Sequence, residues 1–185
     1  MNTPNKITVF RMFIAPIFLL VFLSGVKYGY FISAAIFALG AITDFIDGNM
    51  ARKRNIVTNF GKLLDPIADK MLVAAALLAL MHDGFCNIWF VMLILTRDFA
   101  VTSVRMIASS QGVVIPANIW GKVKTVTQMV SLIAVMLLAG FNAVLSLGIN
   151  VSLISNIIMA VVTVITVVSG LVYIIDSRKV IKYDK

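Results

Sequence analysis

The chain has 185 residues, of which 61% are hydrophobic and only 13% are charged, and its formal net charge is +8. Soluble domains average about 45–50% apolar and about 25% charged residues, so this composition excludes an ordinary soluble domain and favours a multi-spanning membrane protein. The length allows one domain, because six spans of about 20 residues each leave no room for a second one. The basic residues lie beside hydrophobic segments, as expected for contacts with membrane lipids, so we expect no nucleic-acid partner.

The hydrophobic pattern predicts an all-α integral membrane protein with six transmembrane helices in a single catalytic domain, 1–185. A short amphipathic segment at residues 2–11 is expected to lie along the membrane interface and to lead into the first span. The spans are predicted at about 8–23, 31–49, 61–81, 88–109, 122–141 and 151–175. The connections between them are expected at 24–30, 51–59, 82–87 and 111–120.

Basic residues gather at one end of the predicted spans. With six spans both termini lie on one side of the membrane, and that side collects Lys6, Arg11, Arg52, Lys53, Arg54, Lys62, Lys122, Lys124, Arg178, Lys179, Lys182 and Lys185. The loops on the opposite side hold only Lys27. Because positive charge is retained on the cytoplasmic face, we expect both termini to be cytoplasmic in a multi-pass protein of the inner membrane.

Four acidic residues are concentrated where the second span ends and the third begins: Asp44, Asp47, Asp65 and Asp69. Each pair is three or four residues apart, so each pair shares one face of its helix. Carboxylates near lipid are costly, and four together repel one another unless a cation holds them. Carboxylate oxygens suit Mg²⁺ or Mn²⁺, and four of them are enough for two ions that share ligands. The sequence therefore predicts a divalent-metal site at the cytoplasmic boundary, and hence an enzyme.

Small and basic residues lie among these acids. Three small residues, Gly48, Ala51 and Gly61, let helices approach closely and leave room for a nucleotide or a headgroup. Arg52 has a planar guanidinium group that can donate two hydrogen bonds to phosphate oxygens. The whole pattern is Asp44-x2-Asp47-Gly48-x2-Ala51-Arg52-x8-Gly61-x3-Asp65-x3-Asp69. It resembles the complete signature of the CDP-alcohol phosphotransferase family, membrane enzymes that make phospholipids by displacing CMP from a CDP-linked donor.

The resemblance implies a fold of six membrane helices, a site near the cytoplasmic boundary and a homodimer. It also implies roles for individual residues. Asp44, Asp47 and Asp65 would be metal ligands, and Asp69 would complete the second metal site and act as the catalytic base. The residues that would contact the CDP-lipid are Asn5, Thr8, Gly48, Arg52 and Thr58.

Three further stretches resemble the family members whose acceptor is glycerol 3-phosphate. They are Asn2-x-Pro4-Asn5-x2-Thr8-x2-Arg11, the pair Arg97-Asp98, and Gly121-Lys122-Val123-Lys124-Thr125 followed by Gln128-Met129. This resemblance implies that the phosphatidyl group of CDP-diacylglycerol passes to sn-glycerol 3-phosphate. The products would be phosphatidylglycerophosphate and CMP.

A dianionic acceptor needs basic partners, and the fourth and fifth spans supply them. Arg97 and Arg105 are eight residues apart, about two helical turns, and Lys122 and Lys124 begin the next span. We expect these four residues to bind the acceptor phosphate, although the two lysines would also suit a purely interfacial role. Asp98 lies seven residues before Arg105 and is expected to pair with it.

Three other functions remain open at this stage. The same fold could use another acceptor, such as inositol phosphate, serine or phosphatidylglycerol. An aspartate-rich membrane prenyltransferase also binds a diphosphate through Mg²⁺, but it would release pyrophosphate in place of CMP. A cation transporter could use the four acids, although transporter sites usually lie near the membrane midplane.

Overall fold

The computed structural model describes the backbone of residues 3–54, 59–110 and 119–178, and the side chains of residues 12–43, 68, 70–109 and 119–177. Within these residues the chain forms six helices and no strand. They are α1 (Thr3–Leu23), α2 (Gly29–Arg54), α3 (Asn59–His82), α4 (Ile88–Ser110), α5 (Ile119–Leu145) and α6 (Val151–Arg178). The prediction of an all-α protein with six helices is confirmed.

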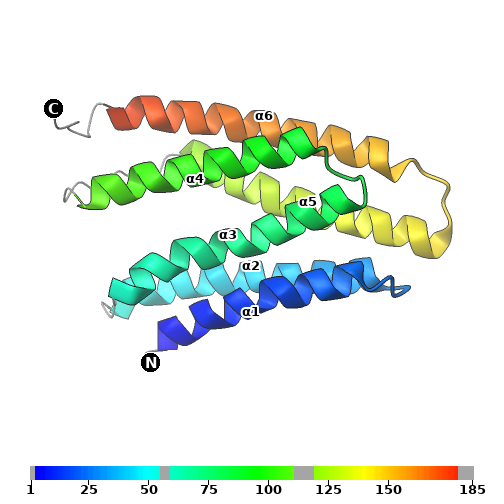
Figure 1. Cartoon of the computed structure of the whole chain (residues 1–185), viewed down its shortest axis with the longest axis horizontal. Coiled ribbons are helices and arrows are strands. Elements are labelled where there is room, and N and C mark those ends of the chain that lie inside the picture. Colours follow the sequence, from blue (N-terminus) through cyan, green and yellow to red (C-terminus); the bar gives the residue numbers. More distant parts are fainter. Residues whose placement is uncertain (1–2, 55–58, 111–118, 179–185) are drawn as a thin grey trace.

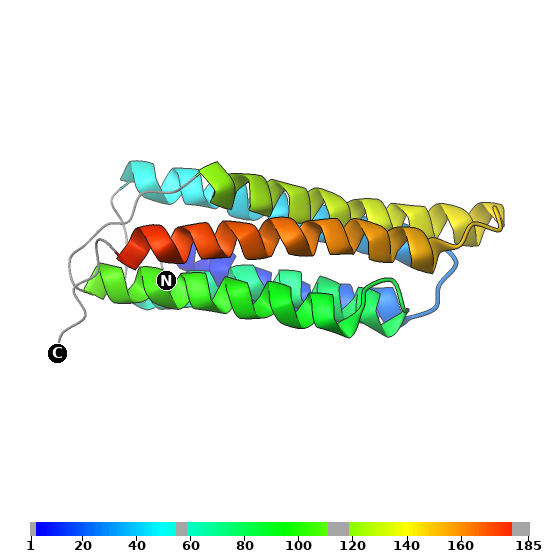
Figure 2. The ribbon, with the colours of Figure 1, turned by 90° about the horizontal axis from the view of Figure 1, so that it is seen from above.

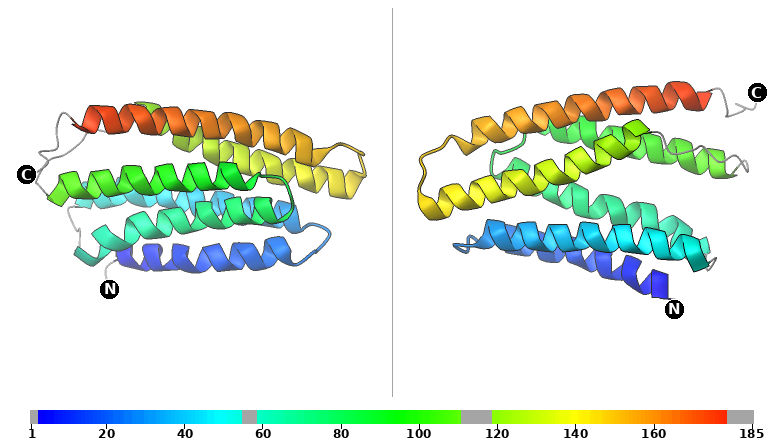
Figure 3. Two further views of the ribbon diagram at one scale, coloured as in Figure 1. Left: turned by 45° about the horizontal axis from the view of Figure 1, so that its top comes forward. Right: turned by 180° about the vertical axis from the view of Figure 1, so that it is seen from behind.

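The helices form an elongated antiparallel bundle with two halves (Figure 1). In one half α1 packs against α2 and α3, and in the other α6 packs against α4 and α5. The contacts of α2 with α5 and of α3 with α4 and α5 join the halves. Both ends of the chain lie at the same end of the bundle, which is also where α2, α4 and α6 finish (Figure 2). A second pair of views shows the same arrangement from other sides (Figure 3).

Local signals in the sequence explain the turn between α3 and α4, which occupies the predicted residues. Gly84 has a φ of +75°, which other residues rarely adopt. The amide of Phe85 donates to the carbonyl of Leu80 at 2.8 Å, which closes the end of α3. The side chain of Asn87 then caps α4 by accepting from the amide of Trp89 at 3.0 Å.

All six helices extend beyond their predicted spans, α1 at its start and α2 at its end by five residues each. Residues 3–11, which were expected to form a short segment leading into the first span, are continuous with that span, because α1 runs from Thr3 to Leu23 without a break. Pro4 fits the first turn of a helix, where its missing N–H costs nothing. Similarly, α2 continues to Arg54 although its span was expected to end at residue 49, because residues 50–54 are all good helix formers. The remaining expected loop residues 55–58 and 111–118 lie outside the described part of the chain.

The side chains are distributed as expected for a protein surrounded by lipid. Large apolar residues lie on the outside, among them Leu20, Val126 and Val164, each more than half exposed. Buried polar residues lie inside, among them Ser155 and Thr166. A water-soluble bundle would show the reverse. Of the described helices, α5 and α6 contain stretches long and apolar enough to cross a membrane, whereas the apolar stretches of α1, α2 and α3 are shorter.

Candidate functional site

A cavity of about 570 Å³ opens between α3, α4, α5 and α6. It exists because α6 packs against both α4 and α5, while the described backbones of α4 and α5 make no such contact with each other. The charged residues that line it are Lys70, Arg97, Asp98, Arg105, Lys122 and Lys124. Among the described side chains five cations face one carboxylate, so this part of the cavity suits an anion. All four residues predicted to bind the acceptor phosphate line this one cavity.

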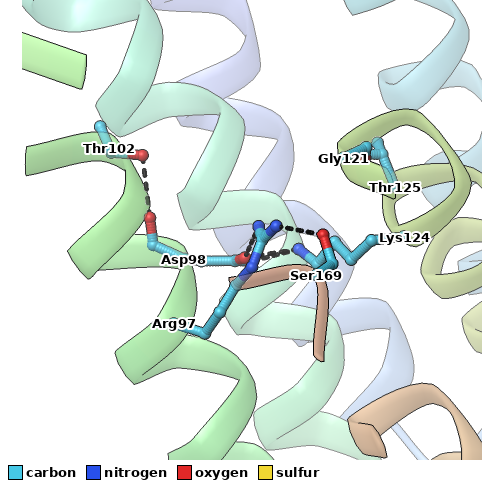
Figure 4. A network of polar contacts seen from close by, with 7 residues as sticks. All are labelled: Arg97, Asp98, Thr102, Gly121, Lys124, Thr125 and Ser169. Atoms are coloured by element: carbon cyan, nitrogen blue, oxygen red, sulfur yellow. Dashed lines mark hydrogen bonds and ion pairs between the residues drawn. The ribbon is translucent and has the colours of Figure 1, made fainter. Parts of the chain in front are cut away.

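Asp98 is the centre of a buried ionic network (Figure 4). The Nζ atom of Lys124 lies 2.5 Å from Oδ1 and 2.7 Å from Oδ2 of this carboxylate. Nη1 of Arg97 approaches Oδ1 at 3.2 Å. The side chains of Lys124, Asp98 and Arg97 are only 7%, 10% and 13% exposed. Such charges are tolerated at this depth because each has an opposite charge beside it.

Arg97 is also held from α6. Its Nη2 donates to Oγ of Ser169 at 2.7 Å, and Ser169 is only 1% exposed. The next residue is Gly170, where an added Cβ would lie 2.5 Å from Cγ of Arg97. The arginine stem therefore lies directly against the α6 backbone, and its guanidinium is fixed by contacts on two sides.

Arg105 has a different environment from the one predicted. Its guanidinium carbon lies 5.7 Å from the ring centroid of Tyr173, in cation–π geometry. The expected pair between Arg105 and Asp98 is wrong, because Asp98 is engaged by Lys124 and Arg97. Arg105 and Lys122 are exposed in the cavity and have no ion-pair partner among the described side chains.

Four of the five cations thus fall into two groups. Lys124 and Arg97 share the charge of Asp98, so they contribute a net charge of about one to the cavity wall. Arg105 and Lys122 present charge that no described carboxylate balances. An incoming anion would find its strongest unsatisfied partners in this second group.

The predicted metal ligands belong to adjacent helix ends. Asp44 and Asp47 lie in the C-terminal half of α2, and Asp65 and Asp69 lie in the N-terminal half of α3. Only four residues separate the end of α2 from the start of α3, so the backbone brings both pairs to one end of the bundle. Among the described side chains there is no group of three or more His, Cys, Asp or Glu that could hold a metal ion. The side chains of these four aspartates lie outside the described part, so the metal site stays a prediction.

The predicted CDP-lipid residues cannot be compared in side-chain detail. The backbones of Asn5, Thr8, Gly48 and Arg52 are helical, but their side chains lie outside the described part. Thr58 lies outside it altogether. Lys70 links this region to the cavity, because it follows Asp69 directly and lines the cavity wall.

Sequence reasoning missed Lys70 and Tyr173 of the cavity wall, and also Ser169 and Gly170, which contact Arg97 from α6. Lys70 could have been found from its place beside Asp69. Ser169 and Gly170 gave a weaker signal, because a small polar pair in an apolar span usually indicates only close helix packing. Nothing in the sequence indicated that Tyr173 faces Arg105.

Comparisons with known proteins found a matching family model and several similar relatives. A family model described as CDP-alcohol phosphatidyltransferase matches residues 1–179. A Bacillus subtilis protein named CDP-diacylglycerol–glycerol-3-phosphate 3-phosphatidyltransferase is 40% identical over 74% of this chain and 77% of its own length. A Rickettsia bellii protein with the same name is 35% identical over 96% of both chains. A Mycobacterium tuberculosis protein named probable phosphatidylglycerophosphate synthase is 36% identical over 94% of this chain and 80% of its own.

Proposed function

Because this chain belongs to the CDP-alcohol phosphatidyltransferase family, we propose that it transfers the phosphatidyl group of CDP-diacylglycerol to sn-glycerol 3-phosphate. The products are phosphatidylglycerophosphate and CMP. The observation that carries the choice of acceptor is the cavity, whose described side chains include five cations and one carboxylate and so fit a small phosphorylated alcohol. The names of the relatives favour the same donor and acceptor.

The cavity gives the acceptor a polar place beside the predicted reaction centre. Arg105 and Lys122 bind the phosphate of glycerol 3-phosphate, and Lys70 adds charge on the side nearest Asp69. Arg97 and Lys124 are partly neutralised by Asp98, and their remaining positive charge adds to the electrostatic attraction of the phosphate. With its phosphate held in this way, the acceptor presents its primary hydroxyl toward the ends of α2 and α3.

The four aspartates fit the metal that the family uses, since carboxylate oxygens are the donors that Mg²⁺ and Mn²⁺ prefer. Asp44, Asp47, Asp65 and Asp69 would hold it, in two sites that share ligands. When bound, the cations supply charge neutralisation for the diphosphate of the donor. Gly48, Arg52 and Thr58, with Asn5 and Thr8, bind the CDP moiety.

The reaction is one substitution at phosphorus. Asp69 takes the proton of the acceptor hydroxyl, whose oxygen attacks the β-phosphorus of CDP-diacylglycerol. The bond from the β-phosphorus to the bridging oxygen breaks, and that oxygen leaves with CMP. A carboxylate is a weak base for an alcohol, so the orientation of the acceptor by the cavity carries much of the rate enhancement.

The apolar exterior supports a place in the membrane, with all six helices as spans and the site at the cytoplasmic side. Trp89 at the start of α4 and Trp120 at the start of α5 lie near opposite ends of the bundle, where indole side chains favour the two membrane interfaces. A homodimer in the cell inner membrane, with both termini cytoplasmic, completes the proposal.

The test is CMP release by the purified protein in mixed micelles of detergent and CDP-diacylglycerol. Each candidate acceptor is supplied in turn: glycerol 3-phosphate, inositol phosphate, serine and phosphatidylglycerol. Turnover with glycerol 3-phosphate at least tenfold above the others is expected. Preference for another acceptor would contradict the assignment while leaving the family intact.

Asp69→Asn keeps the size of the predicted base and removes its charge. We expect CMP release to fall at least 1,000-fold, because both proton removal and a metal ligand are lost. The helical circular dichroism signal should stay unchanged. Asp83→Asn, which removes a carboxylate at the opposite end of the bundle, is the control and should retain nearly full activity. Activity of Asp69→Asn close to that of the control would remove Asp69 from the mechanism.

A further inference from the structure

We propose that α6 positions both arginines of the acceptor cavity, Arg97 through Ser169 and Gly170, and Arg105 through the ring of Tyr173; this rests on the proposed function. The arginines are in α4, and the three α6 residues were assigned no role by the sequence. The claim is that α6 sets where the two guanidinium groups lie, and therefore how tightly the acceptor phosphate is held.

The register of the two helices supports this role. Helices α4 and α6 pack side by side and run in the same direction along the bundle (Figure 1). Arg97 precedes Arg105 along α4, and their partners follow in the same order, because Ser169 precedes Tyr173 by four residues on α6. Residues four apart share a helix face, so one face of α6 serves both arginines.

The contact at Arg97 requires both α6 residues. Ser169 accepts the hydrogen bond from Nη2 at 2.7 Å. A side chain at position 170 would collide with Cγ of Arg97 at 2.5 Å, and that atom is part of the stem and not its free end. Nη1 is fixed at the same time by Asp98. A guanidinium with both ends engaged has one orientation, which suits the recognition of a phosphate.

At Arg105 the aromatic ring is the important group. Tyr173 is 5% exposed, and its buried hydroxyl has no hydrogen-bond partner among the described residues. The hydroxyl therefore contributes nothing to holding Arg105, and the ring face supplies the attraction. The two groups can therefore be tested separately, because phenylalanine removes only the hydroxyl and leucine removes the whole ring.

Two variants remove the contacts, a third changes Tyr173 but keeps its ring, and a control changes the same helix elsewhere. Ser169→Ala removes the acceptor for Arg97, and Tyr173→Leu removes the ring beside Arg105. Ser155→Ala removes a buried hydroxyl of α6 that has no hydrogen-bond partner, and Tyr173→Phe keeps the ring. The measurements are the KM and kcat for glycerol 3-phosphate, the KM for CDP-diacylglycerol, and the rise in melting temperature that glycerol 3-phosphate produces.

Ser169→Ala and Tyr173→Leu should each raise the KM for glycerol 3-phosphate about three- to tenfold. Their kcat should change less than about twofold, and their KM for CDP-diacylglycerol should stay as it was, since a purely structural defect would not separate these constants. Tyr173→Phe, which keeps the ring, should raise the KM for glycerol 3-phosphate less than Tyr173→Leu does, and Ser155→Ala should match the unaltered protein. The stabilisation by glycerol 3-phosphate should shrink in the first two variants only.

Two results would overturn the inference: unchanged acceptor KM in both variants, or equal changes for Tyr173→Phe and Tyr173→Leu. Failure of the proposed function would look different, because the unaltered protein would then release no CMP with glycerol 3-phosphate. In that case the melting temperature with inorganic phosphate decides. Stabilisation that is lost in Ser169→Ala and Tyr173→Leu supports positioning of an anion by α6, and equal stabilisation in all five proteins refutes it.

Discussion

The carboxylate of Asp98 is the one negative charge that the described side chains contribute to the wall of the cavity, and two cations depend on it. Lys124 and Arg97 lie within 3.2 Å of it, and all three side chains are largely buried. Burial makes the loss of any partner costly, but the cost is not equal for the three residues. The difference gives a test of the charge balance.

Asp98→Asn and Lys124→Met are both nearly isosteric, and they should differ clearly in stability. The first leaves two buried cations side by side, which should cost about 3–5 kcal/mol of the free energy of unfolding. The second leaves Arg97 and Asp98 as a balanced pair, so we expect a cost of only about 1–2 kcal/mol. The melting temperatures of the two variants in detergent show which of them is less stable. If Lys124→Met melted at or below the temperature of Asp98→Asn, the network would not be organised around the carboxylate.

At the scale of whole helices, α5 lines the cavity at one end and packs against another helix at the other. Its first turns supply Lys122 and Lys124 to the cavity, and its other end packs against α2. That packing depends on Gly140, because a Cβ there would lie 2.9 Å from two ring atoms of Phe31. The ring is held in turn by an edge contact with Phe141, so it has little room to move.

Gly140→Ala should therefore destabilise the protein by about 1–3 kcal/mol, the usual cost of overpacking. Gly121→Ala is the matched control in the same helix, because nothing lies within 4 Å of the added Cβ. Alanine favours a helix over glycine by about 1 kcal/mol, so the control should be neutral or slightly more stable. Equal melting temperatures of the two variants would show that the contact between α2 and α5 is looser than described.

The described part of the molecule has an apolar exterior and an apolar core with some buried polar residues, and its cavity lies at the end where α1 begins and α6 finishes. Orientation in the membrane can be tested with single introduced cysteines. The buried Cys86 is first replaced by serine, so that any labelling comes from the introduced cysteine. Lys27→Cys should react with a membrane-impermeant maleimide on intact spheroplasts, because the opposite face has so little positive charge. Lys122→Cys should react only after the membrane is opened. The reverse pattern would invert the proposed topology.

Much of this architecture could be predicted from the sequence. Hydrophobic periodicity gave six helices, and the four cations expected to bind one phosphate do line one cavity. The partner of Asp98 could not be predicted, because spacing along α4 aligns it with Arg105 but says nothing of Lys124, 26 residues away. The contribution of α6 was also hidden, because the significance of Ser169 and Tyr173 depends on which helix packs beside them.

The central claim is that aspartates at the adjoining ends of α2 and α3 hold divalent cations on which transfer depends. The most direct measurement is CMP release from CDP-diacylglycerol and glycerol 3-phosphate, first with excess EDTA and then after Mg²⁺ or Mn²⁺ is restored. We expect turnover to fall below about 1% with the chelator and to recover with the metal, because the metal supplies much of the stabilisation of the transition state. Turnover that continues undiminished in EDTA would contradict the account.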